Sequence, residues 1–463
     1  SRWAVALTAN SHGTPQGCPL APLWCNLAMA VWERGLVRRF QQVRGLSYLD
    51  DRILHSRIIG DLEASIAWTR DWDASIHASL NVQKSTWIPL GPAGRRAAKD
   101  QWEDAVLGIP RAHEDRILHL GAQHTYGPKA RHSHCSQRVV NALARLSAVR
   151  FLPPGYRSFC AADAVSSLYH AGGNYYTQRQ LSQVRNSLCR ALIGSGRERM
   201  GMRAPEACLL LTAPGLHQLD PQTSAIYACV NQARRTLSQF SARSAWDAVW
   251  PRRSHHAAGP LFILHTALNR QGWTWPSRYV LCDTRGKQHD LCINTPESKH
   301  DLREALRLDA CGRLAARRPR DFGGLEHGFN RRAAHDSFSK HGGSVLHTGA
   351  LWHRRRLYAA GLASSPSCHL CGSASADTAH LLWECSFREH HRAQLFAVHP
   401  ELEERVRLAP PMLRHCGLIP PTWHLSLQQK TAHLQYMCAS VVDWCRHQLT
   451  HAADLGLRRG ALH

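Results

Sequence analysis

Acidic residues are scarce in this sequence of 463 residues, in which 34 Asp and Glu face 57 Lys and Arg for a formal net charge of +23. This balance favours polyanions as partners, usually nucleic acid, bound with an affinity that salt weakens. An arginine-rich proteome would give the same balance in many of its proteins. Charge alone therefore gives only a modest preference for nucleic acid.

Long uninterrupted apolar runs are also missing. The stretch from Trp3 to Trp32 has no Asp, Glu, Lys or Arg, but prolines and glycines break it, so it does not have the pattern of a membrane span. A secretory signal has a charged segment, then an apolar core, then a cleavage site. The first residues of this sequence do not show that order. The first residue is Ser1 rather than Met, and we expect the natural N-terminus to lie upstream.

Cysteine is present in number but not in a disulfide framework. The 16 Cys are mostly isolated, and 44% of the residues are hydrophobic, which is enough for cores that need no disulfides. The length favours two to four structural units. We expect an intracellular, reducing location. The sequence shows no internal repeat and no long low-complexity tract.

The pattern of apolar residues predicts an α+β fold. The first helix should begin near Pro22, because Leu20, Leu23 and Leu27 lie near helical spacing. The further predictions, in chain order, are a hairpin of residues 45–49 and 52–55 with Asp50 and Asp51 at its turn, an amphipathic helix over 61–80, a strand near 87–88, helices over 139–149 and 180–193, and a terminal helix within 421–463.

A loop rich in glycine and proline precedes the first helix. From Gly13 to Asn26 the sequence reads GTPQGCPLAPLWCN. Gly17 permits a close backbone approach, the helix N-terminus offers free N–H groups to phosphate, and the Gln16 amide can contact a base or sugar. Ordinary helix entries also use proline and glycine, so this loop alone does not identify a function.

Two adjacent carboxylates, Asp50 and Asp51, follow Tyr48 and Leu49 at the predicted turn. Like charges this close repel one another, and a bound cation such as Mg²⁺ would remove that cost. Two such ions about 3.5–4 Å apart can activate an attacking 3′-OH and stabilise a leaving pyrophosphate. An isolated Asp-Asp pair is more often only a polar turn.

Taken together and in this order, the two motifs resemble the palm of the reverse transcriptases of non-LTR (LINE-like) retrotransposons. In that family a G-x-P-Q-G-x-P-L-[SA]-P…N segment opens a helix and a Y-x-D-D hairpin follows. The gap between Asn26 and Tyr48 is similar to the family's. The resemblance implies an RNA-directed DNA polymerase of the nucleus that uses two Mg²⁺ ions. Its partners would be an RNA template, a DNA primer or target and deoxynucleoside triphosphates, with no membrane.

The resemblance also assigns roles to individual residues. Asp50 and Asp51 would be ligands of catalytic Mg²⁺, with Asp50 the more direct one. Lys84 matches a family lysine near the nucleotide's phosphates and would act as a general acid or a charge clamp, although an exposed surface lysine is the alternative. Leu120 and Gly121 resemble a Leu-Gly hairpin that grips the primer. The residues implied in nucleotide and template binding are Gly13, Pro15, Gln16, Gly17, Pro19, Leu20, Asn26 and Tyr48.

One departure from the family pattern concerns catalysis. The family carries another metal-binding aspartate on a strand upstream of the loop, whereas no Asp or Glu lies between Ser1 and His12. Asp61, Asp71 and Asp73 follow the hairpin on a predicted helix and are poor substitutes. Two-metal chemistry without one carboxylate strand should lose most of its rate, so we expect this chain alone to be inactive.

A separate group of thiols and imidazoles has the spacing of a metal site. Cys368, Cys371, His380 and Cys385 give C-x2-C-x8-H-x4-C, with a helix predicted over residues 378–384. Four such ligands close a tetrahedral shell without an open position, which is typical of structural Zn²⁺. His369, His390 and His391 compete for the fourth place, and chance clustering is the alternative.

Residues 361–385 also resemble the zinc-binding segment found C-terminal to the polymerase in many LINE-like elements. In those elements the segment helps to bind nucleic acid during target-primed synthesis. The resemblance implies phosphate contacts from flanking arginines. These arginines are Arg354, Arg355, Arg356, Arg388 and Arg392.

Together with these two resemblances, the sequence predicts a partial polymerase palm (right-hand fold), a helical thumb-like region and a small zinc-knuckle segment. The expected divisions are a palm over 1–135, a thumb-like region over 136–250, a basic helical connector over 251–350, the zinc knuckle over 351–400 and a helical region over 401–463. The main rival function is a non-catalytic, nucleic-acid-binding remnant of a decayed element. An intron-encoded maturase would lack the zinc segment, and no recognisable ribonuclease H, Walker or Ser-His-Asp spacing is present.

Overall fold

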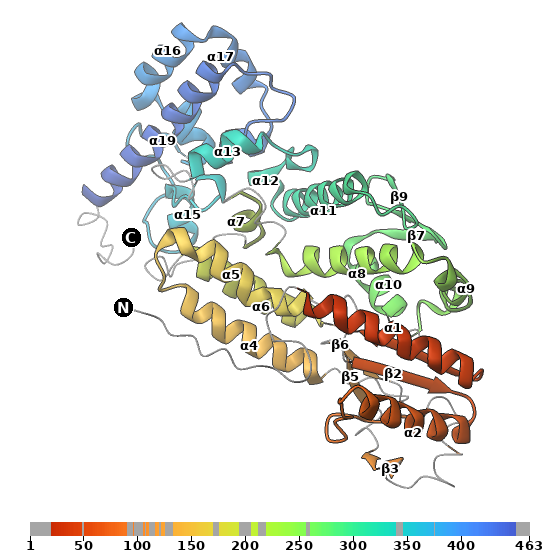
Figure 1. Cartoon of the computed structure of the whole chain (residues 1–463). Coiled ribbons are helices and arrows are strands. Elements are labelled where there is room, and N and C mark those ends of the chain that lie inside the picture. The colour runs from red at the N-terminus through yellow and green to blue at the C-terminus, as the bar shows by residue number, and fades with distance from the viewer. Residues whose placement is uncertain are drawn as a thin grey trace, which may run out of the picture. The chain divides into compact units, whose positions relative to one another are not determined.

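The structure is a computed structural model (Figure 1). It describes residues 20–48, 51–89, 96, 105–106, 108–110, 116–119, 122–125, 133–169, 176–193, 205–211, 219–255, 260–338, 346–374 and 376–450. The chain divides into two compact units, the first of residues 1–119 and 124–130 and the second of residues 120–123 and 131–463. Helices and strands occur in both, as the predicted α+β class requires.

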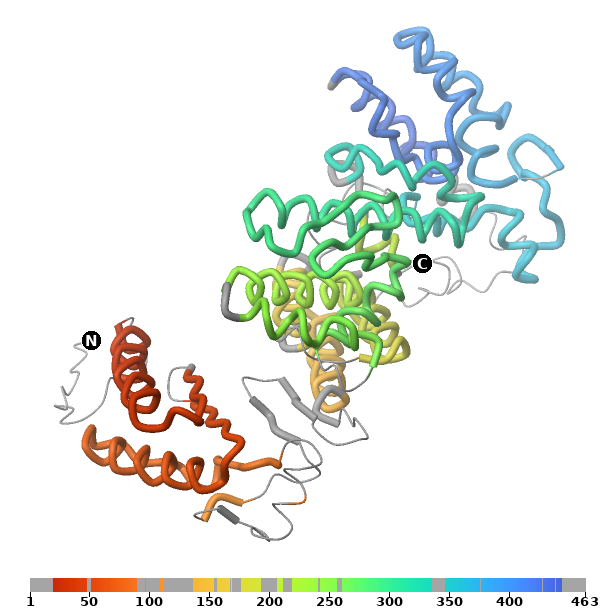
Figure 2. Tube along the Cα trace, turned by 90° about the vertical axis from the view of Figure 1, so that its right-hand side faces the viewer, coloured from red at the N-terminus to blue at the C-terminus, as the bar shows by residue number. Residues whose placement is uncertain are grey.

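The first unit begins with α1 (Ala21–Arg39), whose N-terminal turn contains Pro22, as predicted. Proline suits this position because the first N–H groups of a helix have no internal partner. Met29, Trp32 and Leu36 form the buried face of α1. In Figure 2 α1 and the helix α2 (Ile59–Ser75) appear as red and orange tubes.

A hairpin of β1 (Val43–Tyr48) and β2 (Asp51–Ser56) connects these helices. The strands are antiparallel, and the pairs run from Val43 with Ser56 to Tyr48 with Asp51. The predicted hairpin is therefore confirmed, but one detail was wrong. Asp51 is the first residue of the returning strand rather than a turn residue, because its backbone already pairs with Tyr48.

Helix α2 is shorter than predicted, since it ends at Ser75 instead of near Leu80. His77 adopts a left-handed φ of 59°. The N–H of Ala78 donates to the carbonyl of Asp73 at 2.8 Å, and that of His77 donates to Ala74 at 3.1 Å. This pair of hydrogen bonds ends the helix at a residue with positive φ. The spacing of apolar residues continues past this point, and it therefore predicted a longer helix.

Two small apolar clusters hold the first unit together. Trp32, Leu36 and Val43 form one of them with partly buried side chains of α2 and β2. Ile66, Trp87 and Ile109 form the other.

Where a strand was predicted, Trp87 makes a single bridge, and its N–H donates to Pro110 at 3.1 Å. Short strand pairs follow in the chain: β3 (Ala105–Val106) with β4 (Ile109–Pro110), and β5 (Arg116–His119) with β6 (Ala122–Thr125).

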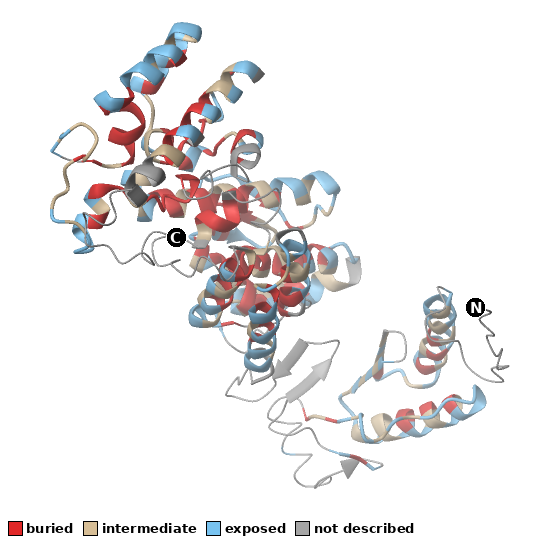
Figure 3. Ribbon diagram, turned by 90° about the vertical axis from the view of Figure 1, so that its left-hand side faces the viewer, coloured by how far each residue is buried: buried red, intermediate tan, exposed pale blue. Residues whose placement is uncertain are grey.

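Helices dominate the start of the second unit. They are α4 (Ser133–Val149), α5 (Pro154–Tyr169), α6 (Gln178–Ile193) and α7 (Pro205–Leu211). The helices predicted over 139–149 and 180–193 are thus confirmed. Their apolar faces share one core that includes Leu146, Val165 and Leu188. In Figure 3 buried residues, drawn in red, are concentrated where helices of the second unit lie close together.

The next part of this unit combines helices with a small sheet. The elements are α8 (Pro221–Leu237), α9 (Phe240–Val249), the 3-10 turn η5 (Trp250–Arg252), α10 (Pro260–Gln271), β7 (Thr274–Ser277), β8 (Val280–Cys282), β9 (Gln288–Asp290) and α11 (Pro296–Arg317). The antiparallel sheet β7-β8-β9 lies inside the stretch expected to be a helical connector, and no strand was predicted there. Strands of three or four residues carry too short an alternation to stand out from loops.

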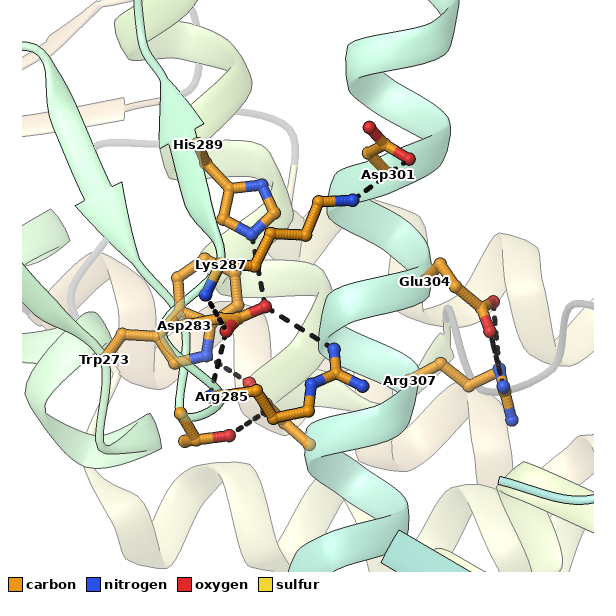
Figure 4. A network of polar contacts seen from close by, with 10 residues as sticks. Trp273, Asp283, Arg285, Lys287, His289, Asp301, Glu304 and Arg307 are labelled. Atoms are coloured by element: carbon orange, nitrogen blue, oxygen red, sulfur yellow. Dashed lines mark hydrogen bonds and ion pairs between the residues drawn. The ribbon is translucent and has the colours of Figure 1, made fainter. Parts of the chain in front are cut away.

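Buried polar contacts fasten this sheet to α11 (Figure 4). The Asp283 carboxylate accepts the backbone N–H groups of Arg285 and Lys287, both at 2.9 Å, which shapes the turn between β8 and β9. Trp273 and Thr284 both donate to Asp309 of α11. The ring of His289 stacks on Trp273. These groups are hydrogen-bonded to one another inside the fold. We therefore assign the network a structural role in holding the sheet on α11, and no catalytic role.

The C-terminal part is built from short helices and one long one. They are α12 (Pro319–Phe322), η7 (Leu325–His327), α13 (Arg331–Phe338), α15 (Arg354–Ala359), the π-helical turn η8 (His380–Glu384), η9 (Ser386–Arg388), α16 (Glu389–Val398), α17 (Pro400–Arg407), α18 (Pro411–Cys416) and α19 (Leu427–Thr450). Helix α19 confirms the predicted terminal helix. Among the described residues, every helix is too short or too polar to cross a bilayer.

Candidate functional sites

One face of the β1–β2 hairpin is fixed by an ion pair with α2. The Arg52 guanidinium donates to both carboxylate oxygens of Asp73, at 2.7 and 2.6 Å, and the Asp73 side chain is only 1% exposed. The guanidinium carbon also lies 5.4 Å from the ring centre of Trp32 and 6.0 Å from that of Trp72. Two parallel hydrogen bonds and two aromatic rings give Arg52 a single orientation.

The other strand is fixed to α1. Glu33 accepts the backbone N–H of Ser47 at 3.1 Å and the Ser47 hydroxyl at 2.7 Å. Ser47 is the cross-strand partner of Arg52, so both strands are anchored at the same level of the hairpin. Trp32 donates to the Thr69 hydroxyl at 3.2 Å and links the two anchoring helices.

The opposite face of the hairpin is open. Side chains alternate along a strand, so Asp51 points away from the side on which Arg52 is held. Asp51 is exposed, as are Leu46 and Ile53, which pair across the strands next to it. The fold therefore presents a carboxylate on a rigid hairpin to solvent, where a hydrated cation or a phosphate-bearing ligand can approach.

The other residues predicted for this site are only partly described. Leu20 and Asn26 are exposed, at the start of α1 and within it. Lys84 is exposed, and its backbone N–H is bonded to the side chain of Asn81 at 3.1 Å. Tyr48 ends β1, but its side chain is outside the described part. Asp50, Gly13, Pro15, Gln16, Gly17, Pro19, Leu120 and Gly121 also lie outside the described residues.

Sequence reasoning missed the role of Arg52 and Asp73. Asp73 was considered only as a substitute metal ligand on a helix. The signal that could have revealed it is its spacing, because Asp73 follows Ile66 by seven residues and so lies on the same apolar face of the helix. An acid on such a face requires a cationic partner.

The four residues of the predicted metal site do converge. Their ligand atoms all lie within 4.8 Å of one another. Cys368 Sγ is 3.9 Å from Cys385 Sγ, and Cys371 Sγ is 3.3 Å from His380 Nε2. A tetrahedron with Zn–S and Zn–N bonds of about 2.3 and 2.0 Å has edges of about 3.5–3.8 Å. The donor set and its spacing therefore fit a structural Zn²⁺ ion.

Local backbone geometry explains this convergence. Gly372 has a φ of +75° and donates to the carbonyl of Cys368 at 2.8 Å, which turns the chain tightly between the first two thiols. The predicted helix continues as a π-helical turn, in which the N–H of Cys385 donates to His380 at 2.7 Å. This wider turn places residues five apart above one another, so the imidazole and the last thiol reach the same point.

Comparison with known families adds a separate observation about the N-terminal part. Residues 3–121 match the family model of the reverse transcriptase (RNA-dependent DNA polymerase). The matched segment contains the whole β1–β2 hairpin, Lys84 and the loop from Gly13, whereas the Cys/His cluster lies outside it. No curated protein and no solved structure matches the chain.

Burial sets the protonation of three residues of the Cys/His cluster, which lies C-terminal to the segment that matches the reverse transcriptase family model. It raises the pKa of Cys368 and raises the pKa of Cys385 to about 12, while it lowers the pKa of His380. At neutral pH the imidazole is therefore free to bind a cation, whereas the two thiols keep their protons until a cation displaces them. Zinc binding should release protons for this reason.

The arginines around the metal centre do not form the exposed rim that was expected. Arg354 and Arg388 are buried, Arg392 donates to the carbonyl of Cys385 at 2.7 Å, and Arg356 donates to Gly349 at 2.7 Å. Among these five arginines only Arg355 is exposed. Burial and interior contacts thus leave little of the charge that the sequence suggested for phosphate.

We expect acid to weaken this part of the chain through His433. The imidazole is buried, stacks on Trp383, and finds no hydrogen-bond partner among the described residues. Burial lowers its pKa to about 4, against about 6.5 when unfolded. A lowered folded-state pKa means that stability is complete above pH 6.5 and is lost as pH falls toward 4. The loss from this residue should be about 1.4 kcal/mol per pH unit.

The measurement is urea unfolding of the full chain at several pH values between 6.5 and 4.5. In the variant His433→Leu, which has no imidazole at this position, the free energy of unfolding should fall less steeply with decreasing pH. The difference in slope should correspond to about one bound proton. Comparing two proteins with the same cysteines subtracts the titration of the metal ligands. Equal slopes in the two proteins would contradict the prediction.

Proposed function

We propose that this chain is part of an RNA-directed DNA polymerase of a non-LTR retrotransposon, and that Asp50 and Asp51 carry its two-metal nucleotidyl transfer. The proposal rests most on one observation, an exposed Asp51 on a hairpin inside a segment that matches the reverse transcriptase family. The loop before α1 and the spacing to the hairpin support the non-LTR type. The predicted palm and thumb-like regions remain part of this proposal, as does action in the nucleus.

In this proposal one face of the hairpin anchors it to the helices, and the other face carries the metal-binding carboxylate. Arg52 and Ser47 hold the hairpin on α2 and α1, so Asp51 has a fixed position on the free face. Mg²⁺, when bound there, would supply charge stabilisation at the attacking and leaving oxygens. Exposed Lys84 would bind the phosphates of an incoming nucleotide, and the loop containing Gln16 would contact the nucleotide and template.

The Cys/His cluster has a structural role in this proposal. A closed shell of three thiolates and one imidazole would hold Zn²⁺ without a position for substrate. The exposed Arg355 is the flanking arginine that remains available for phosphate.

Primer extension tests the proposed function. The chain, and a longer version that includes an upstream strand with an aspartate, should be assayed on an RNA template with Mg²⁺ and deoxynucleoside triphosphates. We expect extension by the longer version and loss of extension in Asp50→Ala and Asp51→Ala. Removal of a catalytic metal ligand should lower the rate by a factor of at least about 10³.

Asp71→Ala is the matched control, because Asp71 is an exposed acid of α2 that takes no part in the hairpin. This variant should extend the primer at the original rate. If the longer version does not extend a primer, or if Asp50→Ala leaves extension intact, the polymerase assignment fails. Salt-sensitive binding of nucleic acid without extension would instead support the non-catalytic role.

A further inference from the structure

The turn between α4 and α5 carries an unusual concentration of exposed rings. Phe151, Tyr156 and Phe159 are 66%, 66% and 79% exposed. Tyr156 and Phe159 are three residues apart on α5 and so lie on one side of the helix. Among the described residues the other exposed Phe, Tyr and Trp side chains are less open to solvent, namely Trp24 at 57%, Phe387 at 54% and Tyr358 at 50%. We call the region of Phe151, Tyr156 and Phe159 the α4–α5 surface.

These rings are not required by the core beneath them. The contact between α4 and α5 is already filled by smaller side chains, including Ala142, Leu146, Ala161 and Val165. Exposed aromatic rings that do not complete a core lower solubility, and grouped apolar side chains on a surface mark an interaction site. The α4–α5 surface is therefore suited to a partner.

Charge on these two helices indicates the kind of partner. Between residues 133 and 169 the chain has one acid, Asp163, and four arginines, which are Arg138, Arg145, Arg150 and Arg157. The Arg150 guanidinium lies over the Phe151 ring, 4.6 Å from its centre. Arg145, 61% exposed, lies at the 4.0 Å limit of an ion pair with Asp163. Aromatic rings interleaved with arginines suit a chain of phosphates with accessible base faces.

Hydrogen bonds fix the backbone of the turn that carries these rings. Arg157 Nε donates to the carbonyl of Leu152 at 2.7 Å, across the turn that contains two prolines. The N–H of Tyr156 donates to Pro153 at 3.0 Å. A turn fixed in this way loses little conformational entropy when a ligand stacks on it.

We propose that the α4–α5 surface binds single-stranded nucleic acid by stacking unpaired bases on Phe151, Tyr156 and Phe159, while neighbouring arginines, above all the exposed Arg145, contact its phosphates. A duplex hides the faces of its bases, so the rings select a single strand. This binding goes beyond the proposed polymerase activity and does not depend on it. RNA and DNA share the required chemistry.

The test compares ligands with and without bases. Fluorescence anisotropy of the full chain would be measured with labelled oligouridine, labelled oligothymidine and an abasic sugar-phosphate oligomer of equal length, at a salt concentration that suppresses non-specific attraction. The variant Phe151→Ala/Tyr156→Ala/Phe159→Ala should bind the base-bearing strands about tenfold or more weakly. Its affinity for the abasic oligomer should stay unchanged. The stronger of the two base-bearing ligands then identifies RNA or DNA as the preferred strand.

Two controls keep the outcome interpretable. Val398→Ala/Leu408→Ala removes exposed apolar side chains elsewhere and should leave all affinities unchanged. Phe159→Trp keeps a stacking ring and should retain binding, and Phe159→Ala alone serves if the triple variant melts at a lower temperature. Unchanged affinity for oligouridine and oligothymidine in a folded variant overturns the proposal, and so does an equal loss for the abasic oligomer. A change of oligomeric state in the triple variant without a change in binding would assign the surface to protein contacts instead.

Discussion

Cys371→Ser should release zinc from the full chain and unfold the segment near residues 351–400. Cys371 contributes one of four converging ligand atoms, 3.3 Å from His380 Nε2. The cluster lies in a core that joins Cys368, Leu381 and Cys385 to Leu395 and Met437. Structural zinc sites bind their ion with about 10–16 kcal/mol. Whole domains are stable by only about 5–15 kcal/mol, so loss of a ligand removes much of what holds this part together.

Zinc content per chain and limited proteolysis would measure the effect. Cys292→Ser is the matched control, because Cys292 is a partly buried free thiol away from the cluster. It should keep both its zinc and its resistance to protease. If Cys371→Ser retains a full equivalent of zinc, the four-ligand assignment is wrong and a neighbouring histidine must complete the shell. Chelation of the unaltered protein should reproduce the pattern of cleavage.

Asp73→Ala should destabilise the first unit by about 3–5 kcal/mol, the usual cost of removing one partner from a buried ion pair. The Arg52 side chain is only 13% exposed, so its charge would remain in a low-dielectric setting without its carboxylate. The Trp32 and Trp72 rings would attract the guanidinium but cannot accept its hydrogen bonds. The hairpin should then lose its fixed orientation on α2.

Hydrogen exchange of the β1 and β2 amides would report this change directly, with protection lost in Asp73→Ala. Asp71→Ala tests the same helix, two residues away, with an exposed acid, and should leave exchange unchanged. Asp73→Glu keeps the charge and should recover part of the protection. Equal protection in Asp73→Ala and the unaltered chain would show that the ion pair does not hold the hairpin. In a polymerase assay of the longer version, Asp73→Ala should lower kcat more than it raises KM, because Asp51 would be displaced rather than removed.

The hairpin illustrates how far sequence patterns reach. Alternating apolar residues and the Asp-Asp pair located β1 and β2, but they placed Asp51 in the turn. Cross-strand pairing with Tyr48 decides where a strand begins, and local alternation does not encode that pairing. The end of α2 has a similar cause, since a left-handed His77 stops the helix within an apolar period that continues.

The metal centre shows a different division. The spacing of Cys368, Cys371, His380 and Cys385 identified all four converging residues, because tight turns and single helical turns are local structures. The exposure of the flanking arginines, by contrast, does not depend on local structure. Arg354 and Arg388 are near the cluster in sequence, yet burial within the surrounding helices removes them from the surface.

By itself, the sequence of this chain determined the start of its first helix, its hairpin, its metal-ligand spacing and the order of its two polymerase-like motifs. Each of these depends on residues within a few positions of one another, where propensity and spacing act directly. Only the tertiary structure decided that Arg52 pairs with Asp73, that Glu33 holds Ser47, that a three-stranded sheet follows α10, and that Phe151, Tyr156 and Phe159 remain outside the core. Those outcomes depend on which faces of distant elements meet, and long-range packing is not written in any short window of sequence.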